Sequence, residues 1–196
     1  MLPAFPDDSG VRAGMYRLQE ETEADWWEVE ALYDLCFAPG RTALSSYRLR
    51  DGVPTVAALC LILRDADGIL AAAIRYWPAE AGGQDVLLLG PIAVHPTRQG
   101  EGLGALLINE SLAEARRLGW ERAMLVGDAP YYARFGFGKL ANIVMPPPTN
   151  PDRVLGLALK AGAWAGVAGP VTKATGATLP TQPAQSLPDP IAPGTR

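Results

Sequence analysis

The chain has 196 residues, of which 48% are hydrophobic, and carries a formal net charge of −4. This length suffices for one α/β core and is too short for two ordinary domains. The acidic balance, without any run of Lys or Arg, excludes an electrostatic surface for nucleic acid or for an anionic membrane. Two cysteines and one histidine are too few for a disulfide scaffold or a metal cluster, so no metal is expected. No signal peptide and no apolar run of about 18 residues is found, which predicts a cytoplasmic protein.

The first part of the chain predicts one short strand and two helices. The strand is expected over 16–19. Thr22-Glu-Ala-Asp25 resembles a capping box that opens a helix running to about Phe37. A second, shorter helix is expected over 43–50. On the first helix, the residues spaced for one buried face are Trp26, Val29, Tyr33, Cys36 and Phe37.

Three apolar runs follow, at 55–64, 69–77 and 85–94, and they predict successive antiparallel strands. Asp65-Ala-Asp-Gly68 supplies the turn between the first two runs, because Asp-Gly pairs favour hairpin dihedral angles. Proline cannot donate a hydrogen bond within a strand ladder, so Gly90-Pro91 inside the third run predicts a bulge.

A crossover helix over 104–118 and a further strand over 121–126 complete this unit. Gly119 is well placed to end the helix. The face expected to be buried consists of Leu107, Ile108, Ser111, Leu112, Ala115 and Leu118.

Gly100-Glu-Gly-Leu-Gly-Ala105 is a glycine-rich segment at the start of this helix. The first turn of a helix leaves backbone N–H groups unpaired, and glycines allow a phosphate to approach them closely. The segment therefore predicts an anion-binding helix N-terminus. It also fits the G-x-G-x-x-A fingerprint of dinucleotide-binding proteins, but residues 95–99 separate it from the strand, which argues against that fold.

Two motifs in this chain resemble the GNAT family of N-acetyltransferases. Gln99, Gly102 and Gly104 fit the family's acetyl-CoA signature, and Gly127-Asp-Ala-Pro-Tyr-Tyr-Ala-Arg-Phe-Gly-Phe137 is similar to its last helix and the Gly-Phe after it. The resemblance covers about 15–160 and points to the YhbS-like bacterial branch. It implies an α/β (α+β) fold with a mixed, mostly antiparallel sheet of about six to seven strands, flanked by helices and splayed between strands 4 and 5.

The resemblance further implies that acetyl-CoA is the co-substrate and that two adjacent segments bind it. At the splay, the backbone of Ile92, Ala93 and Val94 would pair with the pantetheine arm like an added strand. Asp128 either contacts the cofactor or caps the next helix at Pro130 as its first residue, and capping is the preferred role. The diphosphate would lie on the glycine-rich segment, at Arg98, Gln99, Gly100, Gly102, Leu103, Gly104 and Ala105.

Tyr132 matches the family position whose hydroxyl protonates the departing thiolate, and a phenol with a pKa of about 10 is protonated at neutral pH. Tyr131 is the alternative acid, although adjacent helical residues point about 100° apart and only one should face the thioester. No base is assigned, because Asp85, Glu28 and Glu30 are candidates by reach only and a water chain is an equal alternative. The expected reaction is direct attack of a primary amine in a ternary complex. The acceptor is a small-molecule amine or a peptide or protein amine.

After the second motif, strands over 142–145 and 153–160 are expected to form a hairpin. Trp164 and Val167 are expected to dock the segment 161–173 on the domain.

The chain is thus divided into a flexible N-terminus at 1–14, one domain at 15–173 and a disordered, Pro-rich tail at 174–196. The sequence does not decide whether the chain forms a homodimer. Two other functions are weighed against the acetyltransferase: a catalytically silent acyl-CoA-binding sensor or interaction module, and a dinucleotide-dependent oxidoreductase.

Overall fold

The computed structural model describes residues 15–37 and 39–175, and the expectations for 1–14 and 176–196 lie outside them. The strands are β1 Tyr16–Glu20, β2 Leu61–Asp65, β3 Leu70–Ala81, β4 Gln84–Val94, β5 Arg122–Val126, β6 Gly138–Lys139, β7 Ile143–Val144, β8 Val154–Ala158 and β9 Gly169–Lys173. The α-helices are α1 Trp26–Phe37, α2 Ser45–Arg48, α3 Leu103–Arg117 and α4 Ala129–Ala133.

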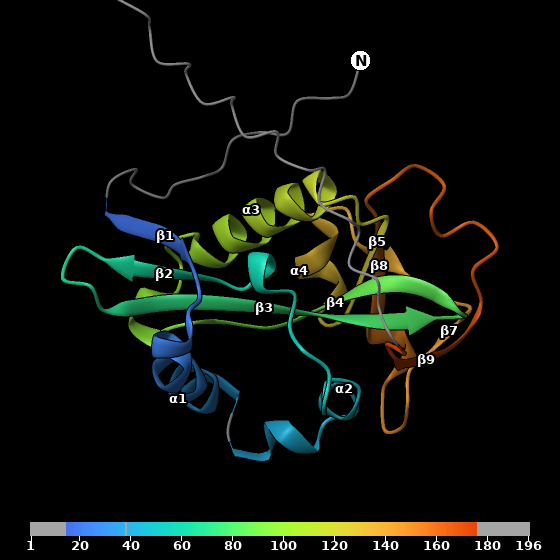
Figure 1. The fold of residues 1–196 in the computed structure, drawn as a ribbon, viewed down its shortest axis with the longest axis horizontal. Helices are drawn as coiled ribbons and strands as arrows, with labels where there is room; N and C mark the ends of the chain where they lie inside the picture. Colours follow the sequence, from blue (N-terminus) through green and yellow to red (C-terminus); the bar gives the residue numbers. More distant parts are fainter. Residues whose placement is uncertain (1–14, 38, 176–196) are drawn as a thin grey trace, which may run out of the picture.

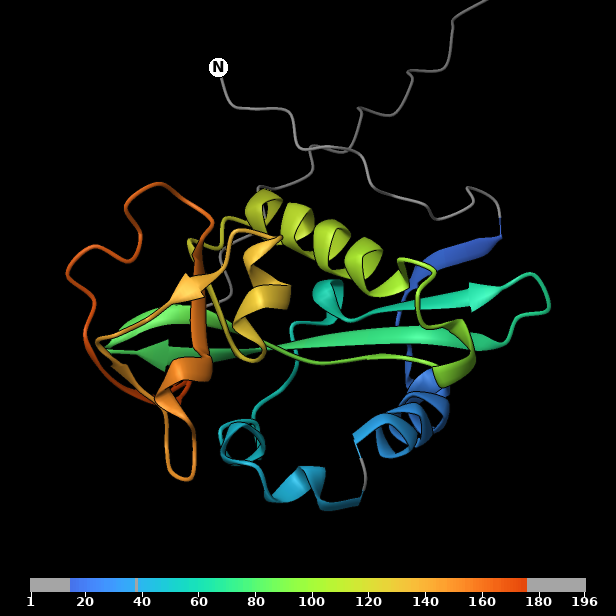
Figure 2. The same cartoon turned by 180° about the vertical axis from the view of Figure 1, so that it is seen from behind.

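The strands form one sheet with helices on both faces, α1 and α2 on one and α3 and α4 on the other (Figure 1, and from behind in Figure 2). The order along the sheet is β1-β2-β3-β4-β5-β8-β6, and β7 and β9 attach beside this path. The predicted mixed, mostly antiparallel sheet is confirmed, with β4 and β5 as a parallel pair. Nine strands are described rather than six or seven, because β6 and β7 are only two residues long. No described helix combines the length and the apolar character needed to cross a membrane.

The strands β1 to β4 form the predicted antiparallel meander. In the turn between β2 and β3, the Asp65 carboxylate accepts two backbone N–H groups and Gly68 takes a φ of +81°. The strand expected over 55–64 is wrong in its first half, where Ala57–Leu59 forms a 3-10 turn and β2 begins only at Leu61. A run of small apolar residues suits a buried turn as well as a strand, so the pattern alone does not separate the two.

Gly90 and Pro91 form the predicted bulge in β4. On one side of the bulge Ile74 of β3 pairs with Ile92, and on the other side Tyr76 pairs with Leu89. Two residues of β4 therefore oppose one residue of β3. A bulge of this kind re-aims the strand and disrupts its ladder locally, here in the middle of the sheet.

The sheet splays between β4 and β5, as predicted. The two strands pair only at Leu87 with Ala123 and at Leu88 with Met124. Beyond this point β4 continues to Val94 with β3 on one side, and no other described strand lies along its second side. Main-chain groups on that side are consequently available to a ligand, apart from the Val94 oxygen, which accepts the Cys36 thiol at 3.4 Å.

The helix α3 buries its predicted face against the sheet, and Gly119, with a φ of +84°, follows its end. Within this face the hydroxyl groups of Ser111 and of Tyr76 on β3 lie 2.8 Å apart in a hydrogen bond. The buried polar pair is thereby satisfied, which a closely packed core requires.

The helix α1 begins after the predicted capping interaction, in which the Thr22 N–H donates to the Asp25 carboxylate at 2.8 Å. The expected buried face is wrong at Trp26, which is 45% exposed, and at Phe37, which is 44% exposed. The stripe that faces the sheet is centred on Val29, Leu32 and Tyr33, so the first and last turns of the helix lie at its edge. The helix expected over 43–50 is also shorter, because a 3-10 turn precedes α2.

The C-terminal strands pair differently from the expected hairpin. β8 pairs with β5 and β6, whereas β7 pairs in parallel with β9. β9 also joins the edge of β3. Trp164 and Val167 pack against the core, as predicted. The described chain continues to Thr175, whose N–H and hydroxyl donate to Glu80 at 3.0 and 2.7 Å.

Candidate functional site

The glycine-rich segment forms the N-terminus of α3, as predicted. Gly102 is the N-cap residue with a φ of +79°, and Gly100 has a φ of +86°. No side chain in the described part of the chain caps this helix, so its first-turn N–H groups are open to an anion. The positive φ is the reason for a glycine at 100. Crowding is not the reason, since an added Cβ would meet no atom within 4 Å.

Gly104 brings the predicted cofactor segments and α4 into contact. A Cβ at this position would lie 3.6 Å from Cγ2 of Val94 and 3.2 Å from the hydroxyl oxygen of Tyr131. The first turn of α3 therefore lies against both the open side of β4 and the tyrosine pair of α4. Only a residue without a side chain permits this approach unhindered.

Three polar side chains border the segment. Arg98 donates from Nη2 to Oδ2 of Asp65 at 2.9 Å, which ties the segment to the turn between β2 and β3. The Tyr16 hydroxyl donates to Glu101 at 2.5 Å, and this bond raises the pKa of Tyr16. Gln99 is exposed. An anion at this helix terminus would therefore depend chiefly on main-chain amides, with Arg98 already engaged by a carboxylate.

The helix α4 is positioned by its cap. The Asp128 carboxylate accepts the Tyr131 N–H at 3.3 Å, which confirms the capping role. Pro130 occupies the second helical position rather than the first, because the helix begins at Ala129. Tyr132 packs over Gly127, where an added Cβ would collide with the tyrosine ring. The cap and this contact together fix the direction of the Tyr132 side chain.

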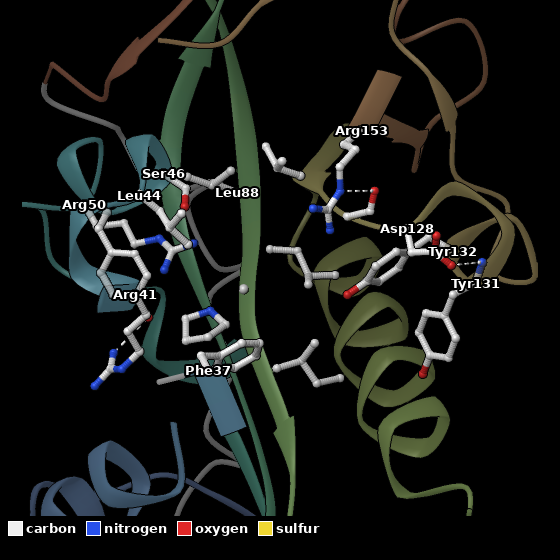
Figure 3. Close-up of a pocket in the computed structure, with 17 residues that line it drawn as sticks. Phe37, Arg41, Leu44, Ser46, Arg50, Leu88, Asp128, Tyr131, Tyr132 and Arg153 are labelled. Carbon is white, nitrogen blue, oxygen red and sulfur yellow. Dashed lines mark hydrogen bonds between the residues drawn. The ribbon is translucent and has the colours of Figure 1, made fainter. Parts of the chain in front are cut away.

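The two neighbouring tyrosines point in different directions (Figure 3). Tyr132 points from α4 toward the middle of the pocket, whereas the Tyr131 hydroxyl lies beside the start of α3. Their rings meet edge to face with centroids 5.0 Å apart. Burial raises the pKa of Tyr132 to about 12 and also raises the pKa of Tyr131. Both hydroxyls are therefore protonated at neutral pH.

A pocket of about 350 Å³ lies beside the bulge of β4. One wall comes from the segment between Phe37 and Arg50, and the opposite wall comes from the end of β5, from α4 and from Arg153 (Figure 3). Of the predicted site residues, Ile92, Asp128 and Tyr132 line this pocket. Ala93, Val94 and the glycine-rich segment lie outside it, farther along β4 and at the start of α3.

Three arginines line the pocket, and no sequence pattern predicts them. Arg41 is bound by Glu30 and by Asp34. Arg153 donates from Nε to the backbone oxygen of Gly127 at 3.2 Å. Arg50 is buried. Three of the four charged residues that line the pocket are thus arginines, although the chain as a whole is acidic.

Among the described residues that line the pocket there is none of the three carboxylates named as candidate bases by reach. Glu28 and Glu30 form ion pairs with arginines, and Asp85 is exposed at the start of β4. The acid among the lining residues is Asp128, whose carboxylate already caps α4.

A sequence profile of the acetyltransferase (GNAT) family matches residues 13–137 of the chain. The uncharacterized N-acetyltransferase YhbS of Escherichia coli is 30% identical over 112 residues, which are 56% of this chain and 65% of YhbS. The match thus spans slightly less than two thirds of this curated relative. The uncharacterized N-acetyltransferase YjhQ of Escherichia coli is 40% identical over 50 residues, 26% of this chain and 28% of YjhQ.

Two solved structures are similar over most of the described fold. Escherichia coli YhbS in complex with CoA superposes with a TM-score of 0.71 at 24% identity, covering 89% of this chain and 93% of that one. A GNAT family acetyltransferase from Brucella melitensis in complex with acetyl-CoA superposes with a TM-score of 0.55 at 30% identity, covering 76% and 97%. The first of these similarities concerns the fold alone.

Proposed function

Because the chain belongs to the GNAT acetyltransferase family, we propose that it transfers the acetyl group of acetyl-CoA to a primary amine by direct attack within a ternary complex. The observation that carries this proposal is the contact at Gly104, which joins an uncapped helix N-terminus to the open side of β4 and to the α4 tyrosines. These features bind a phosphate, pair with an amide arm and supply a proton donor, respectively.

The residues present fit the binding of acetyl-CoA. The first-turn amides of α3, from Gly100 to Ala105, would hold the diphosphate, and the glycines at 100, 102 and 104 present no side chains to it. The backbone of Ile92 to Val94 would pair with the pantetheine arm along the splay. The Brucella melitensis GNAT acetyltransferase, which is 30% identical and was solved with acetyl-CoA, supports this ligand class. A contact between Asp128 and the cofactor stays a prediction, since its carboxylate also serves the cap.

Bound acetyl-CoA supplies an activated thioester. Tyr132 is our choice of general acid, because its side chain points into the pocket and burial keeps its hydroxyl protonated. Its proton would pass from Oη to the departing sulfur. Tyr131 suits a supporting role, since its hydroxyl lies beside Gly104 at the start of α3.

The amine must be neutral when it attacks. In the described residues no free carboxylate lines the pocket to take its proton, whereas three arginines do line it. Nearby positive charge lowers the pKa of an amine and so favours the neutral form. The lining therefore assists deprotonation into water without a dedicated base.

The decisive experiment measures thiol release from acetyl-CoA with a panel of amines, alongside calorimetric binding of CoA. We expect CoA binding together with amine-dependent thiol release. CoA binding without thiol release for any amine would instead indicate a silent acyl-CoA sensor. A thermal shift with NAD(H) but none with CoA would overturn the proposal in favour of dinucleotide binding.

A further inference from the structure

Arg50, just after α2, is a buried cation without an acidic partner. The residue is only 9% exposed, and its Nε and Nη1 groups are buried without any hydrogen-bond partner. The neighbouring Arg41 and Arg75, by contrast, each bind two carboxylates. Unpaired donors of a buried charged group are costly, so this arrangement favours a ligand that brings acceptors.

Two aromatic rings hold the Arg50 guanidinium in place. Its central carbon lies 4.6 Å from the ring centroid of Tyr47 and 4.7 Å from that of Trp77. Ring faces attract the cation but accept no hydrogen bonds in the guanidinium plane. Burial lowers the pKa of Arg50 to about 10, so the group still carries its charge at neutral pH. The rings therefore orient a planar, charged group whose Nε and Nη1 donors are unpaired.

The Arg50 guanidinium lines the same pocket as Tyr132 and adjoins the bulge of β4. Arg50 lines the pocket from the side opposite Tyr132 (Figure 3). A Cβ built on Gly90 would lie 3.8 Å from Nη2 of Arg50, so the cation adjoins the bulge of β4. The open side of β4 begins at this bulge, where the thioester would end. An anion on Arg50 would thus sit within the acceptor half of the pocket.

We propose that Arg50 binds the carboxylate of the acceptor, so that the substrate is a small amino acid or a related amine that bears a carboxylate. This inference rests on the proposed function and names the substrate class of the same site. A guanidinium matches a carboxylate in shape and charge and binds it through two parallel hydrogen bonds. A pocket of about 350 Å³ suits a small molecule. The unpaired charge of Arg50 disfavours a protonated amine that lacks an anion, whereas a carboxylate compensates this charge.

The test compares α- and ω-amino acids with their own carboxamides as acceptors in the thiol-release assay. The native protein should show a kcat/KM about tenfold or more higher for the carboxylate than for the carboxamide, as expected for a charge-assisted contact. Arg50→Gln should abolish this preference, and Arg50→Lys should restore part of it. Arg48→Gln at the end of α2, two residues before Arg50, should leave the preference unchanged, because the Arg48 side chain is exposed and bonded to the Pro147 oxygen.

Equal rates for carboxylate and carboxamide in the native protein would overturn the proposal, as would a preference that survives Arg50→Gln. Thermal unfolding of each variant shows whether it is folded. If Arg50→Gln is unfolded, the test uses Arg50→Lys, which retains the charge. If CoA binds but no amine releases thiol, the transferase function fails by itself. Calorimetric binding of the same amino acids and carboxamides to the CoA complex, with and without Arg50→Gln, then decides on the carboxylate site independently.

Discussion

The proposed site has a cofactor half and an acceptor half, and one is built from backbone groups while the other is built from side chains. The half that we propose binds the cofactor consists of main-chain groups along Ile92 to Val94 and at Gly100 to Ala105, shaped by glycines and a bulge. The acceptor half consists of side chains from the segment between Phe37 and Arg50, held by ion pairs and aromatic rings. A main-chain site binds what every CoA ligand has in common, whereas a side-chain site distinguishes one acceptor from another.

The largest effect is expected where the acceptor half depends on a buried ion pair. Arg75, the β3 residue opposite the bulge, is 6% exposed and binds both oxygens of Glu21, with Nε to Oε2 at 2.8 Å. Glu21→Gln should lower the free energy of unfolding by about 3 kcal/mol, because Arg75 loses its two-point charged partner and keeps only Glu30. Urea denaturation measures the change.

Glu114→Gln is the matched control, since Glu114 pairs with Arg117 on the exposed side of α3. The Glu114→Gln protein should lose at most about 0.5 kcal/mol of unfolding free energy. If both variants lose equally little unfolding free energy, buried ion pairs do not stabilise the acceptor half. The proposed difference between the two halves would then be wrong.

A smaller effect is expected at the junction of the halves. Tyr132→Phe should lower kcat about 100-fold, roughly 2.7 kcal/mol, because the general acid is removed. The KM for acetyl-CoA should change little, since Tyr132 points into the pocket and away from the helix terminus. Steady-state kinetics separate the two parameters.

Tyr131→Phe serves as the comparison for that variant and should lower kcat by no more than about threefold. A Tyr132→Phe protein with full turnover removes Tyr132 from the mechanism. A larger loss of kcat in Tyr131→Phe than in Tyr132→Phe would indicate that Tyr131 is the general acid.

Crowding the cofactor half should weaken binding by about tenfold, or 1.4 kcal/mol. In Gly104→Val the new side chain would stand against the Tyr131 hydroxyl and Val94, and it would obstruct the first turn of α3. Calorimetric titration with acetyl-CoA gives the affinity. Ala113→Val on the exposed side of the same helix controls for helix propensity. An unchanged affinity in Gly104→Val would contradict the assignment of the diphosphate to this turn.

The smallest effect concerns pH. Burial raises the pKa of Tyr132 to about 12, so its protonated form is retained as the pH rises and is lost only on passing that value. From about pH 8 to about pH 10, kcat at saturating substrates should therefore not decline by more than about twofold. A decline centred near the ordinary phenol pKa in the native protein, absent from Tyr132→Phe, would show that the hydroxyl is not shielded.

Much of the fold is predictable because its signals are local. Asp65 to Gly68 marks a turn by its own dihedral preferences, and Gly90-Pro91 marks a bulge because proline lacks an N–H. The pairing of β7 with β9 is not predictable in this way. A two-residue strand is too short to show an alternating hydrophobic pattern. Its pairing partner depends on which strand the folded chain places beside it.

The same division applies to the site. The glycines at 100, 102 and 104 can be recognised because a phosphate-binding helix terminus needs only neighbouring residues. Asp128 and Tyr132 can be recognised because a cap and the residues behind it are close in sequence. Arg50 has no such signal. Its surroundings come from Tyr47 on one element, Trp77 on another and the bulge of β4, which only the folded chain brings together.

By itself, then, the sequence determined the meander, the crossover helix with its open N-terminus and the family to which the chain belongs, because these follow from periodicity and from short glycine and proline motifs. The tertiary structure alone decided which tyrosine faces the pocket, that the pocket of an acidic protein is lined by arginines, and that one of these arginines is left without a carboxylate. The reason is physical: burial and charge pairing depend on distances between segments remote in the chain, and linear order does not specify those distances.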